Sequence, residues 1–509
     1  MASKILTTAP LGLNSFLVEV ESDIQRSLPK TTIVGLADTA VQEAKERVKS
    51  AIINSFLDYP RTSIVINLAP ADLKKIGNHY DLPIALSILE EYDVIKKCEE
   101  ILKKSIFVGE LSFDGSLRKI NNIISTCIFA KENNYENIFL PYENSHEASL
   151  INGINIYAIK NLSELVRFLN NKIKLETIKN TGSLENIFVP ESFEYNFSLI
   201  RGQEYAKRAF IISASGAHNI SMCGSPGSGK TLLARSMPSI LPDLSESEIL
   251  EVSRIYSSVG FLNKENPLII KRPFRSPHHS SSLVSLVGGG GIPKPGEITL
   301  AHRGVLFLDE LPEFPKKNLE TLRQPLEDGK ITISRAQMSL VFPAKFILIT
   351  AQNPCPCGYF GDEIKNCTCT NLQIKNYNQK ISGPLLDRID IHLNISRVKE
   401  KELQNDFISN NSIEIKNQII NARQIQELRF QNDKILTNSE MGLALIKKHC
   451  LIPEEAKKLL GIAIEKYNLS ARGYFRVLKV ARTIADLEKS ENIKTEHIAE
   501  ALQYRKIEI

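Results

Sequence analysis

The sequence predicts a multidomain α/β protein with an N-terminal α+β domain, a central parallel sheet and a C-terminal helical lid. Three observations support this fold class. The stretch GSPGSGKT (224–231) matches the phosphate-binding pattern G-x-x-x-x-G-K-[ST] and lies between a strand-like run and a helical one. The runs GVLFL (304–308) and FILIT (346–350) are continuous apolar stretches, as expected of strands buried on both faces of a parallel sheet. From about residue 403 the pattern is helical and offers no strand candidate.

Length and composition are those of a globular protein with several domains. The 509 residues exceed what one core organises, so we expect about three domains. No run approaches the roughly 18 apolar residues that span a bilayer, and the N-terminus lacks the apolar core of a secretory signal. We therefore expect a cytoplasmic protein with no membrane partner. The net charge of +5 is slight for this length and does not by itself indicate nucleic acid.

Residues 1–172 predict the α+β domain. TTIVGL (31–36) and SIVINL (63–68) are rich in β-branched residues and are typical of strands. The segment between them has apolar positions at helical spacing and begins with Asp38, a favourable first residue for a helix. Short strand-like and helical runs continue to alternate until a closing helical segment.

The remaining boundaries follow from changes in composition. Residues 173–197 are polar without sustained periodicity and are interpreted as a linker. Residues 198–400 carry the phosphate-binding pattern and both apolar strands, and form the predicted nucleotide-binding core. Residues 401–509 form the helical lid.

The phosphate-binding loop predicts a site for a nucleoside triphosphate. Its glycines let backbone N–H groups approach the phosphates, and the following helix adds a partial positive charge. Lys230 is expected to reach the β- and γ-phosphates, and the Thr231 hydroxyl to bind Mg²⁺. The residues expected to contact ATP are those of the loop and of the first helical turn: Gly224, Ser225, Pro226, Gly227, Ser228, Gly229, Lys230, Thr231 and Leu232.

Polar residues follow the two apolar strands in an order that predicts catalysis. Asp309 and Glu310 end the first strand; we expect Asp309 to hold Mg²⁺ through water and Glu310 to polarise the attacking water. Asn353 follows the second strand and is placed to orient that water and to sense the γ-phosphate. Chance would explain the phosphate-binding loop or the acidic strand end singly, but is improbable for both in this order. Asn353 alone is weak evidence, because Asn is common in Asn-Pro turns, and its weight comes from its place after the acidic pair. The sequence therefore predicts an ATPase that uses ATP and Mg²⁺.

Arginines are the candidates for neutralising the charge of the transition state. Arg388 lies in DRID, where it serves either the γ-phosphate of a neighbouring subunit or an internal ion pair with Asp387 or Asp390. Arg472 opens the last long helical segment and is placed to reach the nucleotide from a lid. Arg476, one helical turn later, is the rival for that role.

The chain resembles the Mg-chelatase-like AAA+ ATPases of the YifB/ComM type. The motifs that carry the resemblance are GSPGSGKT, GVLFLDEL, TLRQPLEDGKITISRA, TAQNPCPCGY, ISGPLLDRIDIH and LSARGYFRVLKVARTIADL. VGLADTAVQEAKERVKSAI and NLAPADLKKIGNHYDLPIAL resemble the domain that precedes the ATPase in this family, so the resemblance covers essentially the whole chain.

The resemblance implies roles that agree with the chemistry of the residues. They are Walker A for Lys230 and Thr231, Walker B for Asp309 and Glu310, sensor 1 for Asn353, the arginine finger for Arg388 and sensor 2 for Arg472. It also implies a homo-hexameric ring in which each site is completed by its neighbour.

Two segments are candidates for gripping a substrate in the pore of such a ring. Residues 272–300 form an insert with four consecutive glycines, 288–291, which in this branch of AAA+ proteins projects towards the pore; a solvent loop is the alternative. KITISRAQMSLV (330–341) predicts a β-hairpin where this branch carries its pre-sensor hairpin. Lys330 at its base and Arg335 near its tip are the candidate DNA contacts, with a bare surface hairpin as the alternative.

Four cysteines cluster in the sequence as two Cys-x-Cys pairs with nine residues between them. Cys355, Cys357, Cys367 and Cys369 are able to supply four thiolates to one tetrahedral Zn²⁺. Their place between the strand-like run 346–350 and Arg388 predicts a structural knuckle. Free or redox-labile thiols are the alternative.

The N-terminal domain resembles the Lon-protease-type (ribosomal S5 domain 2-like) fold, most closely at 109–141. A peptidase of that type needs a serine nucleophile in a tight turn and a lysine to activate it. This chain has GNHYDLPIAL (77–86) there, with no serine before the helix, and predicts a non-proteolytic collar that binds DNA or organises the ring. Candidate phosphate contacts, with solvated surface charges as the alternative, are Lys74, Lys75, Arg118 and Lys119.

Three classes of function remain at this stage. The first is a DNA motor, a helicase or branch-migration ATPase acting on single-stranded and branched DNA in homologous recombination during natural transformation, with recombination proteins as further candidate partners. The second is a motor subunit of a magnesium chelatase, for which the sequence shows no tetrapyrrole site. The third is a protein remodeller or chaperone. The chemistry of the residues predicts a ring ATPase, whereas the choice of DNA as its substrate rests on the resemblance.

Overall fold

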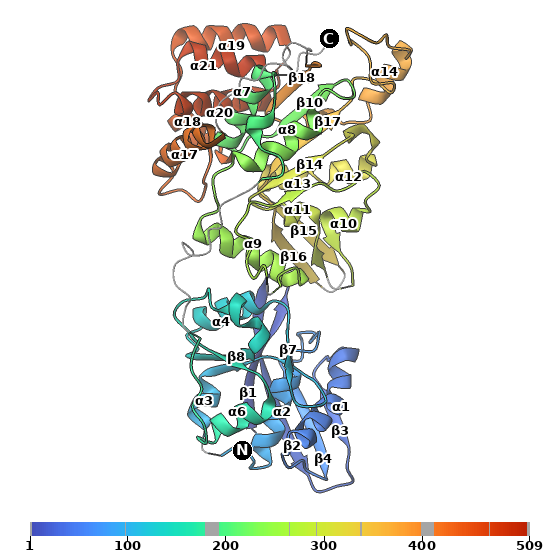
Figure 1. Cartoon of the computed structure of the whole chain (residues 1–509), viewed down its shortest axis with the longest axis vertical. Helices are drawn as coiled ribbons and strands as arrows, with labels where there is room; N and C mark the ends of the chain where they lie inside the picture. The colour runs from blue at the N-terminus through green and yellow to red at the C-terminus, as the bar shows by residue number, and fades with distance from the viewer. Residues whose placement is uncertain are drawn as a thin grey trace. The chain divides into compact units, whose positions relative to one another are not determined.

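The computed structural model describes residues 3–96, 98–178, 193–263, 265–291, 293–335, 338–398, 412–467 and 469–505. The chain divides into two compact units (Figure 1). Unit 1 comprises the described residues of Met1–Phe188 and Ile249–Ile269, and unit 2 comprises those of Val189–Glu248 and Ile270–Ile509.

The boundaries of the units differ from a simple division of the sequence. Residues 249–269, which the sequence places inside 198–400, cluster with unit 1. Helix α9 (Glu246–Val259) begins among the residues of unit 2 and continues among those of unit 1. Most of the predicted linker lies outside the described residues. In the part of the chain that the structure describes, no helix is both long enough and apolar enough to cross a membrane.

Unit 1 is built around a four-stranded sheet and a three-stranded sheet. The first has the order β1-β2-β4-β3, with parallel pairing between β3 and β4 and antiparallel pairing elsewhere. Its strands are β1 (Ser3–Leu11), β2 (Asn14–Gln25), β3 (Thr31–Val34) and β4 (Ser63–Ala69). The second is parallel and consists of β5 (Ser105–Phe107), β8 (Asn137–Pro141) and β9 (Asn155–Ile159).

The predicted alternation of strands and helices in unit 1 is present. The remaining elements are the paired strands β6 (Glu110–Leu111) and β7 (Leu117–Arg118) and the helices α1 (Thr39–Asn54), α2 (Asp81–Glu91), α3 (Glu99–Lys103), α4 (Ile123–Glu132), α5 (Ser145–Ala148) and α6 (Leu162–Leu169). As predicted, Asp38 caps α1: its carboxylate accepts the N–H of Val41 at 2.9 Å. The buried residues of α1, such as Ala44 and Val48, recur at helical spacing.

Unit 2 contains the predicted parallel sheet, with the order β11-β14-β17-β10-β18 and parallel pairing throughout. The strands are β10 (Ile220–Gly224), β11 (Phe274–Arg275), β14 (Val305–Leu308), β17 (Ile347–Gln352) and β18 (Ile391–Ile395). All of β14 and most of β17 are buried, which explains their apolar sequences. Because the strands are parallel, their carboxyl ends meet at one edge, where ligands bind in folds of this kind.

Helices accompany the sheet, and further helices follow it in the described residues. Those within the core are α7 (Glu204–Gly216), α8 (Lys230–Ser236), α10 (Leu283–Val287), α11 (Glu297–Leu300), α12 (Lys316–Glu320), α13 (Arg323–Asp328), α14 (Asn371–Asn378) and α15 (Gly383–Leu386). The C-terminal helices are α17 (Ser412–Arg429), α18 (Leu443–His449), α19 (Glu454–Tyr467), α20 (Ala471–Leu487) and α21 (Thr495–Gln503).

The C-terminal helices share a hydrophobic core with the sheet. Val477 and Ile484 of α20 belong to the same buried cluster as Ile220 of β10 and Phe210 of α7. Figure 1 shows these helices, in red, beside α7, in green. The predicted helical region is therefore present, and in the described residues it packs directly onto the nucleotide-binding core.

The two segments proposed for the pore both form small antiparallel ladders. The predicted hairpin is present, with β15 (Lys330–Arg335) paired to β16 (Met338–Pro343). In the insert, β12 (Gly288–Gly289) pairs with β13 (Lys294–Pro295), so the first two of the four glycines belong to a ladder. A Cβ at Gly288 would lie 2.8 Å from Cδ1 of Ile333, which shows that the insert packs against β15.

Candidate active site

The phosphate-binding loop connects strand β10, which lies between β17 and β18, to helix α8, as predicted. Gly229 has a φ of +87°, a left-handed conformation that other residues adopt only with strain. Gly224 packs against β18, because a Cβ there would lie 2.3 Å from the carbonyl oxygen of Ile395. These two constraints explain why the pattern requires glycine at its first and sixth positions.

Lys230 is buried at the base of this loop. Its ammonium group donates to the carbonyl oxygens of Gly224 at 2.7 Å and Ser225 at 2.9 Å. The Oδ1 atom of Asn353 lies 3.4 Å from the same Nζ. Burial lowers the pKa of Lys230, against the opposing effect of the acidic side chains Cys223 and Asp309. Lys230 and Asn353 therefore meet at the carboxyl edge of the sheet, where the sequence placed both.

Thr231 and Asp309 also converge. The Thr231 hydroxyl donates to Oδ2 of Asp309 at 2.9 Å, although 78 residues separate them in the chain. The other carboxylate oxygen of Asp309 accepts the backbone N–H of Glu310 at 2.9 Å. A hydroxyl and a carboxylate are oxygen ligands of the kind that Mg²⁺ prefers, so this pair fits the predicted metal site.

Glu310 turns away from the strand and meets a histidine. It has a φ of +51°, and its Oε2 lies 3.3 Å from Nδ1 of His279. The ring of His279 contacts that of His278 in a tilted arrangement, with centroids 4.0 Å apart and an interplanar angle of 34°. The Glu310 side chain is exposed and accessible to water, as a residue that polarises a water molecule must be.

Sequence reasoning missed His279 and Gln203. His279 follows β11, the neighbour of β14, but β11 has only two residues and gives no strand-like pattern. Gln203 donates from Nε2 to the carbonyl oxygen of Ser228 at 2.7 Å, which ties the start of α7 to the phosphate-binding loop. The left-handed backbone of Gln203 left no signal in the sequence.

Arg388 is buried, with its side chain only 2% exposed. Its guanidinium donates to the carbonyl oxygen of Pro384 and to Oε1 of Glu327, both at 2.5 Å. Arg388 therefore forms an internal ion pair, but with Glu327 and not with Asp387 or Asp390, the partners that the sequence offered. The hydrogen bond from Arg388 lowers the pKa of Glu327.

Arg472 shares that partner. Its guanidinium lies 2.9 Å from the same Oε1 of Glu327, and its side chain is 57% exposed. Among the described residues, the interactions of Arg388 and Arg472 go to Glu327 and Pro384 and not to the phosphate-binding loop. The structure therefore brings the two arginines together but leaves them apart from Lys230 of the same chain.

Arg476 is occupied elsewhere. It forms an ion pair with Asp390, which is buried and also accepts the backbone N–H of Asn219 at 3.1 Å. Although burial opposes ionisation, Arg476 and His218 hold the pKa of Asp390 below its usual range. Of the two rivals, Arg472 is the one with an exposed guanidinium.

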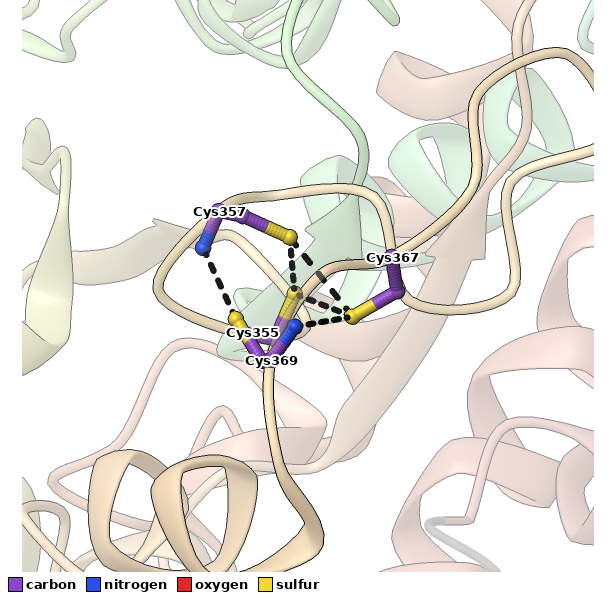
Figure 2. A group of neighbouring side chains, drawn as sticks. All are labelled: Cys355, Cys357, Cys367 and Cys369. Carbon is purple, nitrogen blue, oxygen red and sulfur yellow. Dashed lines mark hydrogen bonds between the residues drawn. The ribbon is translucent and has the colours of Figure 1, made fainter.

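Residues 355–369 are hereafter called the cysteine loop. Their four cysteines come together as predicted (Figure 2). All four Sγ atoms lie within 4.8 Å of one another. The Sγ of Cys355 is 3.4 Å from that of Cys357 and 3.6 Å from that of Cys367. Sulfurs that share a tetrahedral Zn²⁺ at about 2.3 Å would be about 3.8 Å apart, so the spacing fits a zinc ion.

Backbone groups prepare these sulfurs to carry negative charge. The N–H of Phe360 donates to Sγ of Cys355 at 3.3 Å, and the N–H of Cys357 donates to Sγ of Cys369 at 3.4 Å. N–H groups, first that of Tyr359, lower the pKa of Cys357 to about 5. Although the N–H of Cys369 opposes it, burial and the neighbouring thiols raise the pKa of Cys367 to about 12. Four thiols this close cannot all ionise unless a cation compensates their charge.

Comparisons with known proteins identify the family of the chain. Three magnesium-chelatase family models match the chain, described as subunit ChlI (196–403), subunit ChlI of Mg-chelatase (20–144) and the ChlI C-terminal region (409–505). The chain is 40% identical to competence protein ComM of Haemophilus influenzae over 98% of its own length and 97% of that protein. It is also 40% identical to YifB of Escherichia coli, over 99% of its own length and 97% of that protein. The chain belongs to the Mg-chelatase-like ComM/YifB family.

Membership of the ComM/YifB family supports ATPase activity with ATP and Mg²⁺, in agreement with the converging side chains. The likeness to a magnesium-chelatase subunit itself is weaker. The ChlI subunit of Bigelowiella natans is 23% identical over 42% of this chain and 59% of that protein. The Lon-type fold of the N-terminal domain stays a prediction.

The structure describes the side chain of only one of the two candidate DNA contacts in the hairpin. Lys330 is exposed at the start of β15. Arg335 ends that strand, paired through its backbone with Met338, and its side chain lies outside the described part of the structure.

In unit 1, the proposal that Lys75 contacts phosphate is wrong, and so is its alternative as a solvated charge. Lys75 is fully buried and donates to the carbonyl oxygen of Pro70, and burial lowers its pKa. Lys119 pairs with Glu147 at 2.7 Å. Lys74 and Arg118 are exposed.

Proposed function

We propose that the chain is a Mg²⁺-dependent AAA+ ATPase that works as a homo-hexameric motor on DNA. The observation that carries the ATPase part is the convergence of Lys230, Thr231, Asp309 and Asn353 at the carboxyl edge of the parallel sheet. Lys230 would neutralise phosphate charge, and Thr231 and Asp309 would hold the metal ion, which supplies further positive charge to the phosphates. Glu310, exposed beside them, polarises the attacking water.

The arginines support the proposal of a ring. Arg388 and Arg472 share Glu327 and do not reach the loop of their own chain among the described residues. Two arginines held on one carboxylate form a positive group that a neighbouring subunit's γ-phosphate can attract. We therefore assign Arg388 and Arg472 to the site of the adjacent subunit.

Nucleotide binding and hydrolysis test the site. Purified wild-type protein should bind ATP with Mg²⁺ and release phosphate. Lys230→Ala should weaken binding, and Glu310→Gln should bind ATP but hydrolyse it at least about a hundredfold more slowly, because an amide cannot accept the proton of the water. Hydrolysis by Glu310→Gln at the wild-type rate would remove Glu310 from the catalytic role.

We place the DNA substrate among single-stranded and branched structures that arise when incoming DNA recombines in natural transformation. Two features support this: near-full-length similarity to a protein named for competence, and the hairpin β15–β16 with Lys330 and Arg335. Such a motor acts in the cytoplasm beside recombination proteins. The match to three ChlI models favours a chelatase-type motor as the second candidate, and a protein remodeller is the third.

Strand displacement distinguishes these functions. The wild type should displace a labelled strand from a forked DNA substrate in an ATP-dependent reaction. Arg335→Ala should lower displacement more than it lowers phosphate release measured without DNA, since a guanidinium that grips phosphates acts only when DNA is present. If no DNA structure is displaced or stimulates hydrolysis, the DNA motor is wrong and the other candidates take its place.

We also propose that the cysteine loop holds one structural Zn²⁺ through its four thiolates. The spacing of the sulfurs and the N–H groups that point at them support this. Elemental analysis should find about one zinc per chain. Cys367→Ser should lose it, whereas Cys450→Ser, which changes a buried cysteine outside the cluster, should retain it. Wild-type protein without zinc would contradict the proposal.

A further inference from the structure

The cysteine loop packs directly on the phosphate-binding loop. It starts two residues after Asn353, at the end of β17. Gly358, between the two Cys-x-Cys pairs, has a φ of +87°, and a Cβ there would lie 2.7 Å from Cδ of Pro226. No side chain larger than a hydrogen fits between Gly358 and the Pro226 ring. A movement of the cysteine loop therefore presses on, or releases, the phosphate-binding loop.

A buried carboxylate extends this contact. Oδ1 of Asp362 accepts the N–H groups of Ile364 at 2.9 Å and Lys365 at 3.0 Å. Its Oδ2 lies 3.2 Å from Nε of Arg397, and the Asp362 side chain is only 2% exposed. Backbone N–H groups, first that of Lys365, lower the pKa of Asp362 to about 2, so the carboxylate is charged at neutral pH.

Arg397 completes the link to the nucleotide site. It follows β18, the strand beside β10, and its Nε also lies 3.4 Å from Oγ of Ser225. Its guanidinium lies over the ring of Tyr359, 5.7 Å from the centroid. Arg397 thus contacts the cysteine loop through Asp362 and Tyr359, and the phosphate-binding loop through Ser225.

Ser225 carries the connection to the catalytic lysine. Its hydroxyl faces Arg397, while its carbonyl oxygen accepts the ammonium group of Lys230 at 2.9 Å. The side chain is buried, so its position depends on these neighbours and not on solvent. A shift of Arg397 would therefore move a main-chain group that directly holds Lys230.

The cysteine cluster in turn shapes the segment that bears Asp362. Two N–H groups of this segment, those of Tyr359 and Phe360, donate to the sulfurs of Cys357 and Cys355. The N–H of Asp362 donates to the carbonyl oxygen of Tyr359 at 3.1 Å. When the thiolates are held together, these bonds fix where Asp362 points.

We propose that Asp362 and Arg397, hereafter the brace, are positioning residues that couple the four-cysteine cluster to the phosphate-binding loop, so that affinity for ATP depends on the integrity of the cluster. The inference rests on the proposed nucleotide site and extends it, because it makes the affinity of that site depend on residues that do not touch the nucleotide. Metal loss or thiol oxidation at the cluster would then weaken ATP binding without altering Lys230 or Thr231.

Binding of ATPγS with Mg²⁺, measured by isothermal titration calorimetry on the full chain, tests the brace. Asp362→Asn should raise the dissociation constant about tenfold, the usual effect of removing a partner that orients a ligand-holding group. The matched control is Glu363→Gln, which changes the adjacent exposed carboxylate and should leave the dissociation constant unchanged. Equal affinity in Asp362→Asn and the wild type would overturn the proposal.

Arg397 provides the second arm and covers the case in which Asp362→Asn does not fold. Arg397→Gln should weaken binding to a similar extent, and Arg397→Lys, which keeps the charge, should recover part of it. Because the two side chains act as one unit, the double variant Asp362→Asn/Arg397→Gln should be no weaker than the worse single variant. Wild-type affinity in Arg397→Gln, or fully additive losses, would contradict the brace.

The cluster itself is the third arm. Cys367→Ser should weaken ATPγS binding in the otherwise wild-type chain but should have little further effect in Asp362→Asn, where the coupling is already broken. Unchanged affinity in Cys367→Ser would overturn the coupling. If the wild type itself fails to bind ATPγS, the proposed nucleotide site is wrong, whereas wild-type binding with unaffected variants refutes the brace alone.

Discussion

Glu327 offers a sharp test of how the two arginines are held. It is the only described carboxylate that contacts both Arg388 and Arg472, and it does so through one oxygen. Replacing Glu327 with alanine would leave the guanidinium of Arg388, 2% exposed, without a counter-charge. Stranding a buried charge costs about 3 to 5 kcal/mol of unfolding free energy.

The exposure of Glu327 reduces that cost. The carboxylate is 39% exposed, so water can enter the space that alanine would leave and solvate part of Arg388. We therefore expect Glu327→Ala to lower the unfolding free energy by about 1 to 3 kcal/mol. Glu327→Gln keeps an acceptor oxygen and should cost about 1 kcal/mol.

Two measurements on the same proteins check this reasoning. Urea denaturation gives the unfolding free energy, and phosphate release at saturating ATP gives turnover, which should fall about tenfold because both arginines lose their anchor. Glu320→Ala is the control: its pair with Arg323 is more exposed and should contribute less than about 1 kcal/mol. If Glu327→Ala is as stable and as active as the control, Glu327 does not hold the arginines.

Two further predictions concern histidines. His279→Ala should lower kcat about tenfold with little change in ATPγS affinity, because its ring orients Glu310 and not the phosphates; an unchanged kcat in phosphate-release assays would contradict this. Burial lowers the pKa of His79 to about 4, so the unfolded chain binds a proton at a higher pH than the folded chain does. Protonation of His79 therefore lowers the stability of unit 1 as the pH falls from about 6.5 to 4. Burial raises the pKa of Asp81 to about 6, so protonation of Asp81 adds stability as the pH falls over nearly the same range. In urea denaturation at pH 7 and 4.5, His79→Gln should therefore lose less stability on acidification than the wild type, by up to about 3 kcal/mol; equal losses would refute this.

The nucleotide site was largely predictable because a parallel sheet brings the ends of its strands together. If 304–308 and 346–350 are buried strands of one parallel sheet, Asp309 and Asn353 lie near the phosphate-binding loop. The cysteine cluster was predictable for a related reason, since two short pairs on one loop can meet without help from the rest of the fold.

The partners of the arginines were not predictable. Sequence reasoning offered Arg388 its nearest acids, but the fold supplies Glu327, which lies 61 residues away. Asp390 is instead satisfied by Arg476 of α20. Such pairs depend on how helices pack, and periodicity does not encode which charged residues meet across them.

Burial of single polar residues was equally hidden. Lys75 looks like an exposed basic residue in ADLKKIG, yet it is fully buried and bonded to Pro70. The grouping of 249–269 with unit 1 likewise leaves no mark in composition. Asp362 and Arg397 are ordinary charged residues in the sequence, and only their contact with each other and the contact of Arg397 with Ser225 reveal a role.

The rate of ATP hydrolysis with and without forked DNA tests the central claim most directly. The wild-type rate should rise when DNA is added, and Glu310→Gln, which still binds ATP, should hydrolyse it at least about a hundredfold more slowly than the wild type both with and without DNA. A wild-type rate that is the same with forked, single-stranded and no DNA would contradict the proposed DNA motor. Hydrolysis by Glu310→Gln at the wild-type rate would contradict the proposed catalytic site.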